Sequence, residues 1–236
     1  MNAPLASKPY PATKRSKVKR LPKRGHYDRA IVHGVLDAAL IAHIGYVIDG
    51  QPYVTPTCFW REGERVYWHG SSASRMLRTQ REGLPVCLTV THFDGLVLAR
   101  SAFHHSINYR SAMVFGSAAI VDDPDEKLAS LKAFVERITP GRWAEIRGPN
   151  AKELKATTVI GMTIEEAVAK IRTGGPVDDD KDYALPVWAG VVPVAQVVEP
   201  AKPDERLAQG TGWPRHLDHW LAGTRTDEIL AAYEAD

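Results

Sequence analysis

The architecture of this chain is indicated most clearly by residues 41–70, which read IAHIGYVIDG QPYVTPTCFW REGERVYWHG. The segment Ile41–Ile48 is apolar and β-branched, and the Asp49-Gly50 pair after it is a strong hairpin signal. Two further strands are expected over 53–60 and 65–69, with a turn at Glu62-Gly63 between them. These residues therefore predict an antiparallel meander and not a parallel βαβ unit.

The segments around this meander add more strands than helices. We expect helices over 28–40, 71–81, 124–138, 150–156 and 226–233. We expect strands over 85–91, 96–102, 107–121, 157–164 and 186–198, the first two joined through a turn at Asp94-Gly95, while 165–172 suits a helix or a strand. A mainly β fold follows, a split β-barrel with a few flanking helices. A Rossmann sheet is excluded because strands and helices do not alternate and no GxGxxG occurs.

Charge divides the chain into three parts. The net charge is +2, but residues 1–24 hold eight Lys and Arg and no acid, which leaves −6 for residues 25–236. We therefore expect a basic flexible arm over 1–24, one split-barrel domain over 25–198, and an appendage with a short helix over 199–236. The arm could bind nucleic acid or an acidic membrane surface, but it lacks interleaved aromatic residues, so a solvated tail is favoured.

Composition excludes several protein classes. No run of about 18 apolar residues could form a membrane span, and the N-terminus has no secretory signal. The two cysteines, Cys58 and Cys87, build neither a disulfide framework nor a metal site, and the histidines form no metal signature. A cytoplasmic protein with reduced thiols is expected.

The strongest candidate for a ligand site is residues 67–77, YWHGSSASRML, in which a strand, a glycine turn and a Ser-rich helix start follow one another. A helix N-terminus offers free backbone N–H groups, to which Ser71 and Ser74 add hydroxyls and Arg75 a bidentate cation. This arrangement indicates a phosphate site, and plain N-capping by a serine is an equally weighted alternative. Trp188, between small residues, could stack on a planar cofactor, or it could pack in the core.

Six segments taken together resemble the FMN-binding proteins related to pyridoxamine 5′-phosphate oxidase, most closely their nitroimidazole-resistance (Nim-type) branch. These segments are 52–60, 66–70 with the Ser-rich helix start, 109–116, 136–141, 153–158 and 187–190. Each motif alone is weak, but their order and spacing together are fairly specific over residues 25–198.

The resemblance implies a split-barrel homodimer with FMN at the subunit interface. The strand 55–58 would run beside the isoalloxazine ring, 69–75 would hold the ribityl chain and phosphate, and 110–111 would approach across the interface. The residues implied for cofactor binding are Thr55, Pro56, Thr57, Cys58, His69, Gly70, Ser71, Ser74, Arg75, Arg110, Ser111 and Trp188.

The resemblance also implies an FMN-dependent oxidoreductase that passes electrons from a nicotinamide donor to a small planar substrate, a nitro compound or a quinone. His69 would be the acid or electrophile beside the ring. Met76 stands where the wider family often has a lysine, and the basic residues that hold pyridoxamine phosphate are not found, so vitamin B6 oxidation is not expected. The alternatives are a non-catalytic protein that binds or stores flavin or haem, and a nucleic-acid-associated protein that uses the arm.

Overall fold

Nine antiparallel strands form one sheet in the computed structural model, which describes residues 8–74, 76–77 and 82–233. The strands are β1 (Gly25–His26), β2 (Ile41–Ile48), β3 (Gln51–Glu62), β4 (Arg65–Ser71), β5 (Glu82–Leu98), β6 (Ser106–Ile120), β7 (Thr157–Thr163), β8 (Glu166–Arg172) and β9 (Gly190–Pro193). The helices are α1 (Arg29–Asp37), α3 (Pro124–Ile138), α4 (Ala151–Ala156) and α5 (Thr226–Ala232), and the short 3-10 turns are η1 (Pro22–Arg24), η2 (Ala102–His104), η3 (Arg142–Ala144), η4 (Asp180–Ala184) and η5 (Arg215–Leu217).

Strand β6 closes the sheet into a barrel. One edge of β6 pairs with β5 along almost its whole length, and the other edge pairs with β8 over 109–115 and with β7 over 118–120. The ring β6-β7-β4-β3-β2-β5 encloses a core of fully buried side chains that includes Ile44, Trp68 and Leu88. The predicted mainly β split barrel is confirmed.

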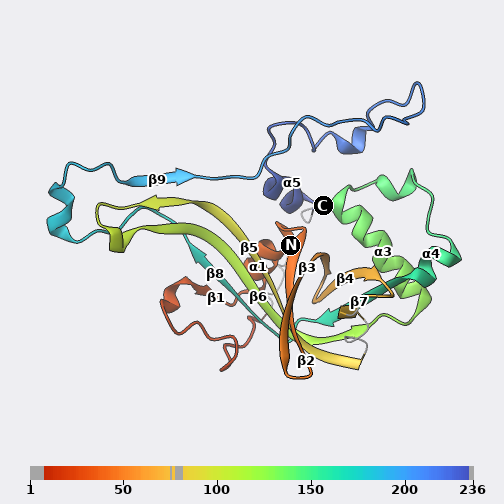
Figure 1. Cartoon of the computed structure of the whole chain (residues 1–236), viewed down its shortest axis with the longest axis horizontal. Helices are drawn as coiled ribbons and strands as arrows, with labels where there is room; N and C mark the ends of the chain where they lie inside the picture. Colours follow the sequence, from red (N-terminus) through yellow and green to blue (C-terminus); the bar gives the residue numbers. More distant parts are fainter. Residues whose placement is uncertain (1–7, 75, 78–81, 234–236) are drawn as a thin grey trace, which may run out of the picture.

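Strand β5 corrects one detail of the sequence-based prediction. The expected turn at Asp94-Gly95 is a register shift inside a single long strand. A Cβ atom on Gly95 would lie 2.7 Å from the carbonyl oxygen of Val192 in β9, so glycine is needed here for close backbone approach. Beyond this point β5, β6 and β9 project from the barrel (Figure 1). We call this projection the arm, and we call residues 8–24 the N-terminal segment.

Residues 8–24 lie against the barrel, whereas the sequence predicts a separate arm over 1–24. Tyr10 is only 3% exposed, and its hydroxyl contacts Glu64 Oε2 at 2.7 Å and His33 Nε2 at 2.8 Å. Arg15 binds Glu166 at 2.8 Å. These partners lie far along the chain, so local composition did not indicate them.

The C-terminal residues also return to the barrel. The expected short helix is present as α5, whose Ile229 and Leu230 are buried, and Arg137 of α3 donates a hydrogen bond to the Leu230 carbonyl at 2.8 Å. Figure 1 shows α5 above the barrel, next to the upper end of α3. Among the described residues, no helix combines the length and the apolar character that crossing a bilayer requires.

Candidate functional site

Strands β3 and β4 separate at one point, and the candidate site lies there. Their ladder runs from Glu62↔Arg65 to Phe59↔Trp68 and then ends. Beyond it, residues 55–58 pair only with β2 and residues 69–71 only with β7 within the part of the chain that the structure describes. We call these two facing stretches, Thr55–Cys58 and His69–Ser71, the split edge. The backbone groups there that point away from β2 and β7 have no ladder partner, and unpaired N–H and C=O groups at a strand edge can bind a ligand that covers them.

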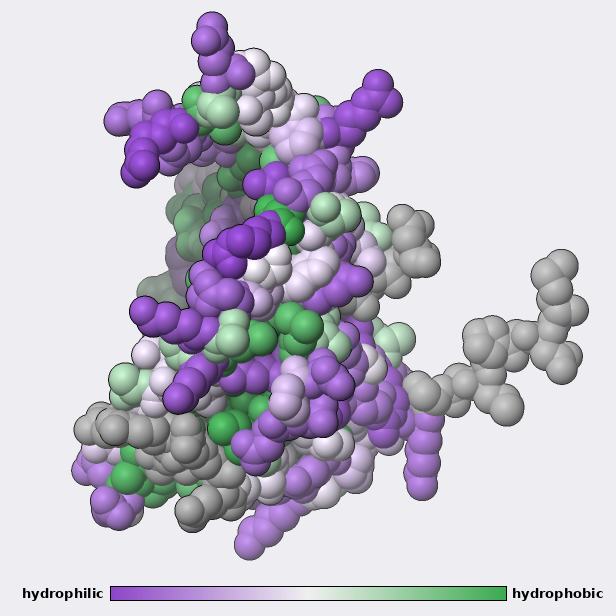
Figure 2. All heavy atoms as spheres, turned by 90° about the vertical axis from the view of Figure 1, so that its right-hand side faces the viewer, coloured by the Kyte–Doolittle hydropathy of each residue, from purple (hydrophilic) through white to green (hydrophobic). Residues whose placement is uncertain are grey.

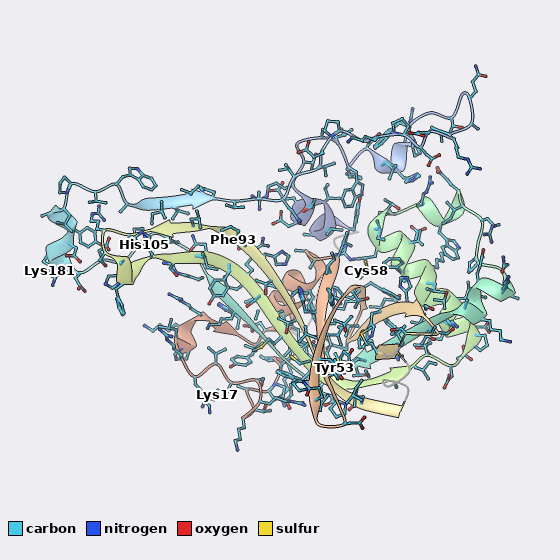
Figure 3. All side chains as sticks on the ribbon, viewed as in Figure 1. Lys17, Tyr53, Cys58, Phe93, His105 and Lys181 are labelled. Carbon is cyan, nitrogen blue, oxygen red and sulfur yellow. The ribbon has the colours of Figure 1, made fainter. Side chains whose placement is uncertain are left out.

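The side chains of 55–58 alternate across the sheet. Pro56 and Cys58 are exposed, while Thr55 and Thr57 are half-buried. The Thr55 hydroxyl is 3.1 Å from the Tyr46 hydroxyl, which holds it against the barrel. In Figure 3, Cys58 lies on the side of the barrel nearer α3, and His105 lies far from it along the arm.

The turn after β4 is tightly bonded. Ser74 N–H donates to the Ser71 carbonyl at 2.9 Å, and Ala73 N–H donates to Ser71 Oγ at 3.2 Å. Gly70 allows the next segment to pack close, because a Cβ there would lie 3.0 Å from Leu77 Cδ1. The structure thus brings His69, Gly70, Ser71 and Ser74 together, and Arg75 falls outside the described residues.

The His69 ring lies in an aromatic cage beneath α3. Its centroid is 4.7 Å from that of Phe134 and 5.7 Å from that of Trp60. Its Nδ1 is buried, and no hydrogen-bond partner for it exists among the described residues; the same holds for Trp60 Nε1. Burial lowers the pKa of His69, so the neutral imidazole prevails near neutral pH. A neutral, partnerless ring nitrogen can accept a hydrogen bond or ligate a metal ion.

Arg110 lies in a different environment. Its guanidinium donates to Asp94 at 2.8 Å and to Asp227 of α5 at 2.7 Å, and Arg225 bonds the same Asp227 at 3.0 Å. We call these four residues the Arg110 cluster. The hydrogen bond to Asp94 raises the pKa of Arg110, so its charge is permanent and already balanced within one chain. The cluster borders a cavity of about 310 Å³ that His92 and Phe93 also line.

Within one chain, the order of the strands places Arg110, Ser111 and Trp188 away from His69 and the split edge. Ser111 of β6 pairs with Thr91 of β5, and β2 lies between β5 and β3. Three strand spacings, about 14 Å, separate Ser111 from residues 55–58 of the split edge. On the other side, β7 lies between β6 and β4, but it pairs with β6 only over 118–120, whereas Arg110 and Ser111 pair with β8. Trp188 is 65% exposed and precedes β9 by two residues, and Figure 1 shows β9 on the opposite side of the molecule from β4. Arg110, Ser111 and Trp188 therefore do not meet His69 within one chain.

Apolar side chains are exposed on the outward face of β2, β3 and β6. Ile41, Val54 and Met113 are 57%, 67% and 38% exposed. Phe103 at the arm's end is 89% exposed. Contiguous exposed apolar groups mark interaction surfaces, so this face and the arm are candidates for contact with another protein surface.

The C-terminal loop adds a second cavity that no sequence motif indicates. It has a volume of about 600 Å³ and lies between η3 and the loop that carries Leu207 and Trp213. Nearby, His216 Nδ1 is 3.2 Å from Glu145. Figure 2, which looks onto the side that bears α3 and α4, shows hydrophilic groups on the protruding parts and hydrophobic groups in a hollow below the top.

The sequence analysis did not identify Phe134, which contacts His69, or Asp227, which binds Arg110. Phe134 follows Leu131 by three residues on the apolar face of α3, so helical periodicity could have placed it toward the sheet. Asp227 lies 117 residues from Arg110, and no local pattern joins the two.

Comparisons with known proteins agree with this geometry. The family model described as pyridoxamine 5′-phosphate oxidase matches residues 28–171. No curated protein sequence matches the chain.

Three solved structures illustrate the range of similarity. The flavocytochrome Anf3 from Azotobacter vinelandii is 44% identical, with a TM-score of 0.85 over 91% of this chain and 100% of that one. The FAD and haem binding protein from Mycobacterium smegmatis is 35% identical, with a TM-score of 0.81 over 86% and 98%. A protein assigned to 5-nitroimidazole antibiotic resistance from Bacteroides thetaiotaomicron is 20% identical, with a TM-score of 0.52 over 62% and 86%, and shares the fold.

Proposed function

The chain belongs to the pyridoxamine 5′-phosphate oxidase family, since the family model matches more than half of it, and on this premise we propose that it is a redox protein that binds a flavin nucleotide at the split edge and a haem beside it. The family inferred from the motifs is confirmed, and the fold is the flavin-binding fold of that family. The observation that carries the proposal is the split edge itself, where the β3–β4 ladder ends beside the half-buried imidazole of His69, whose Nδ1 has no hydrogen-bond partner among the described residues.

The split edge fits a flavin. Residues 55–58 would offer backbone donors and acceptors to a ring edge, and the Ser71 and Ser74 hydroxyls of the turn after β4 would bind the ribityl chain and phosphate. The sequence resemblance favours FMN, but the 35% identical relative is named for FAD. We therefore propose FAD as the flavin and treat FMN as the alternative that the experiment below distinguishes.

A homodimer completes the site in this proposal. The exposed apolar face of β2, β3 and β6 and the arm would contact the same surfaces of a second copy. Ser111 and Trp188 would then reach the flavin from the partner subunit, since they are separated from the split edge within one chain.

A haem is the second cofactor in this proposal. The two relatives above 30% identity are named as a flavocytochrome and as an FAD and haem binding protein. In this chain His69 would be the residue that holds the haem, because its ring is neutral and its Nδ1 has no hydrogen-bond partner among the described residues. When bound, the two cofactors would supply hydride and one-electron chemistry. The chain would orient them and exclude water, and the electrons would pass from a nicotinamide donor to a small planar acceptor.

Absorbance spectroscopy tests the assignment. Protein reconstituted with FAD, FMN and haem in turn is desalted and its spectrum recorded, with FAD and haem expected to remain bound. His69→Ala should lose the haem Soret band and keep the flavin bands, while His43→Ala, at an exposed position on β2, should keep both. Protein that retains no flavin would refute the proposal, and an unchanged Soret band in His69→Ala would refute the ligand. Tight flavin binding without reduction by NADH or NADPH under anaerobic conditions would favour the storage alternative.

A further inference from the structure

A row of aromatic rings runs from the split edge along the β3–β4 ladder. The Trp60 ring centroid is 5.7 Å from that of His69 and 5.7 Å from that of Tyr67, and the planes of Trp60 and Tyr67 are 13° apart. Trp60 and Tyr67 are partners in the ladder, and Tyr67 and His69 are two residues apart on β4, so the three rings share one face of the sheet. We call Trp60 and Tyr67 the aromatic pair.

The aromatic pair is enclosed beneath α3, apart from the interior of the barrel. Trp60 is 1% exposed and Tyr67 is 6% exposed, and both belong to a small buried cluster with Val121 and Val159. Phe134 of α3 packs on this cluster, with its ring centroid 5.1 Å from that of Trp60. Helix α3 of the same chain therefore covers the pair, and no partner subunit is needed to shield it from water.

Packing alone does not account for the indole of the pair. Trp60 Nε1 is buried and has no hydrogen-bond partner among the described residues. A buried N–H group without a partner has lost its bond to water and costs stability, whereas a phenylalanine fills a similar space without this cost. Tryptophan and tyrosine are also the aromatic side chains that release one electron most readily. The indole at this position therefore indicates a role that its ring chemistry supplies.

The far end of the row reaches charged and exposed groups. The Arg65 guanidinium lies over the Tyr67 ring at 5.0 Å, the Arg65 side chain is 41% exposed, and it binds Glu126 of α3 at 2.7 Å. Gly161 of β7 leaves room for this contact, because a Cβ there would lie 2.6 Å from Arg65 Nη2 and 3.2 Å from Tyr67 Cε1. Burial raises the pKa of Tyr67, and the charges of Arg65, Glu62 and Glu126 also act on it, so its hydroxyl lies toward these charged groups. The row thus joins the split edge to the exposed surface at the start of β4.

From this continuous row we infer that the aromatic pair relays single electrons from a small reductant at the surface beside Arg65 to the cofactor held at His69, which lets the protein reduce hydrogen peroxide. The inference rests on the proposed function, because His69 holds the haem there. Hydrogen peroxide takes up two electrons and two protons at this site and leaves as two water molecules. Each electron that it takes is replaced through the pair.

The relay steps balance in electrons and protons. Trp60 passes one electron toward the cofactor and takes one from Tyr67, and Tyr67 releases its phenolic proton to solvent as it is oxidised. The Arg65 guanidinium makes a positive charge on the Tyr67 ring unfavourable, so the electron and the proton leave together. A reductant such as ascorbate then returns one electron and one proton to Tyr67. Two ascorbate ions become ascorbyl radicals for each peroxide, with no net uptake or release of protons.

Rapid-freeze electron paramagnetic resonance of the haem-loaded protein mixed with hydrogen peroxide tests the relay directly. Wild-type protein should give a tyrosyl radical signal. Tyr67→Phe, which removes one oxygen atom and keeps the stacked ring, should replace this signal with a tryptophanyl radical, and Trp60→Phe should give neither. The control variants Tyr183→Phe and Trp213→Phe change rings outside the row that are 52% and 47% exposed, and they should leave the tyrosyl signal unchanged.

Steady-state kinetics supply the second readout. Peroxide-dependent oxidation of ascorbate should fall about tenfold or more in Tyr67→Phe and in Trp60→Phe, and remain at the wild-type rate in both controls. The Soret band and the thermal unfolding temperature of Tyr67→Phe should match those of the wild type, which separates loss of the relay from loss of the fold. Wild-type protein that carries haem but forms no organic radical would overturn the relay, as would an unchanged tyrosyl signal in Tyr67→Phe or an unchanged rate in both variants. Protein without a Soret band would instead contradict the proposed haem, and the relay would fall with it.

Discussion

The split edge and the Arg110 cluster treat their polar groups in opposite ways. At the split edge, the ladder between β3 and β4 ends, and His69 Nδ1 has no hydrogen-bond partner among the described residues. In the Arg110 cluster, one guanidinium already has two carboxylates. The sequence resemblance assigns both regions to a single cofactor site, yet only the first has unused hydrogen-bonding capacity.

The two regions therefore differ in role: unpaired polar groups can bind a ligand, whereas paired groups stabilise the fold. A group that is to bind a ligand must be left unsatisfied in the empty protein, and this costs stability, because a buried polar atom without a partner loses its bond to water. Arg110 is instead satisfied by α5, so it stabilises the attachment of the C-terminal segment. An anionic cofactor would have to displace Asp94 or Asp227 to use it.

The largest effect on stability is expected from a substitution in β6, the strand that carries Arg110 and closes the barrel. A methyl group at Gly116 of β6 would overlap the Thr163 carbonyl and lie 2.7 Å from Met162 Cγ. Gly116→Ala should therefore force the backbone apart where the barrel closes, and lower the free energy of unfolding by about 3 kcal/mol. Urea denaturation measures it. Gly34→Ala, on the exposed face of α1 with open space around it, should raise stability by about 0.5–1 kcal/mol. Equal effects would mean that β6 closure is not tightly packed.

A smaller loss of stability is expected when Asp227 is removed from the Arg110 cluster. Asp227→Ala leaves Arg110, whose side chain is 27% exposed, with Asp94 alone. The cluster then carries one uncompensated positive charge; such a charge costs about 3–5 kcal/mol when buried, and the partial exposure and the remaining pair with Asp94 reduce this to about 2 kcal/mol. The control is Glu228→Ala, which removes a 67% exposed partner of Arg225 and should cost less than about 0.5 kcal/mol. Equal losses of unfolding free energy in Asp227→Ala and Glu228→Ala, measured by denaturant unfolding, would show that the Arg110 cluster does not stabilise the fold.

The two regions should also respond to acid in different pH windows. Because burial lowers the pKa of His69, the unfolded state binds its proton first, and stability falls as pH drops below about 6.5 toward the lowered value. Burial alone would raise the pKa of Asp227, but hydrogen bonds from Arg225 and Arg110 lower it, so its contribution is lost only below about pH 4. Burial also lowers the pKa of His33, and other paired carboxyls, such as Asp178, have lowered pKa values, so each loss has more than one source. Thermal melts from pH 7 to 3 should show a smaller first loss in His69→Gln and a smaller second loss in Asp227→Asn. A first loss that is unchanged in His69→Gln would contradict the contribution of this ring.

The smallest effect is expected at an exposed side chain of the split edge. Cys58→Ser should change stability by no more than about 0.5 kcal/mol and flavin affinity by less than about twofold, since the proposed contacts of this stretch are backbone groups. Flavin fluorescence quenching measures the affinity. A tenfold loss would show that the Cys58 thiol itself contacts the ligand.

Local patterns predicted the parts of the fold that local chemistry specifies. The Asp49-Gly50 turn has positive φ at both residues, as a tight hairpin requires. Asp123 accepts from Glu126 N–H at the start of α3, and Asn150 and Glu153 form a capping box at the start of α4, where helices were expected. The bonded turn at Ser71–Ser74 likewise follows from residues next to one another.

Contacts between residues far apart in the chain determine the features that the sequence did not predict. Asp94-Gly95 has the composition of a hairpin turn, but β9 and β6 pair on both sides of it and keep β5 continuous. The aromatic cage of His69 needs Phe134, which lies 65 residues along the chain from it. The charge balance of the Arg110 cluster depends on Asp227, whose position in the sequence is that of an ordinary acidic residue at the start of a helix.

The link between Arg110 and Asp227 has a consequence for how the protein is made. The two residues are 117 positions apart, and at about 5–20 residues per second the ribosome needs roughly 6–25 s to travel between them. Throughout this interval Arg110 can be satisfied only by Asp94 and water, while β5 and β6 are already able to pair. All strands of the barrel ring precede α5 in the chain, so we expect the barrel to assemble first and α5 to attach to it last.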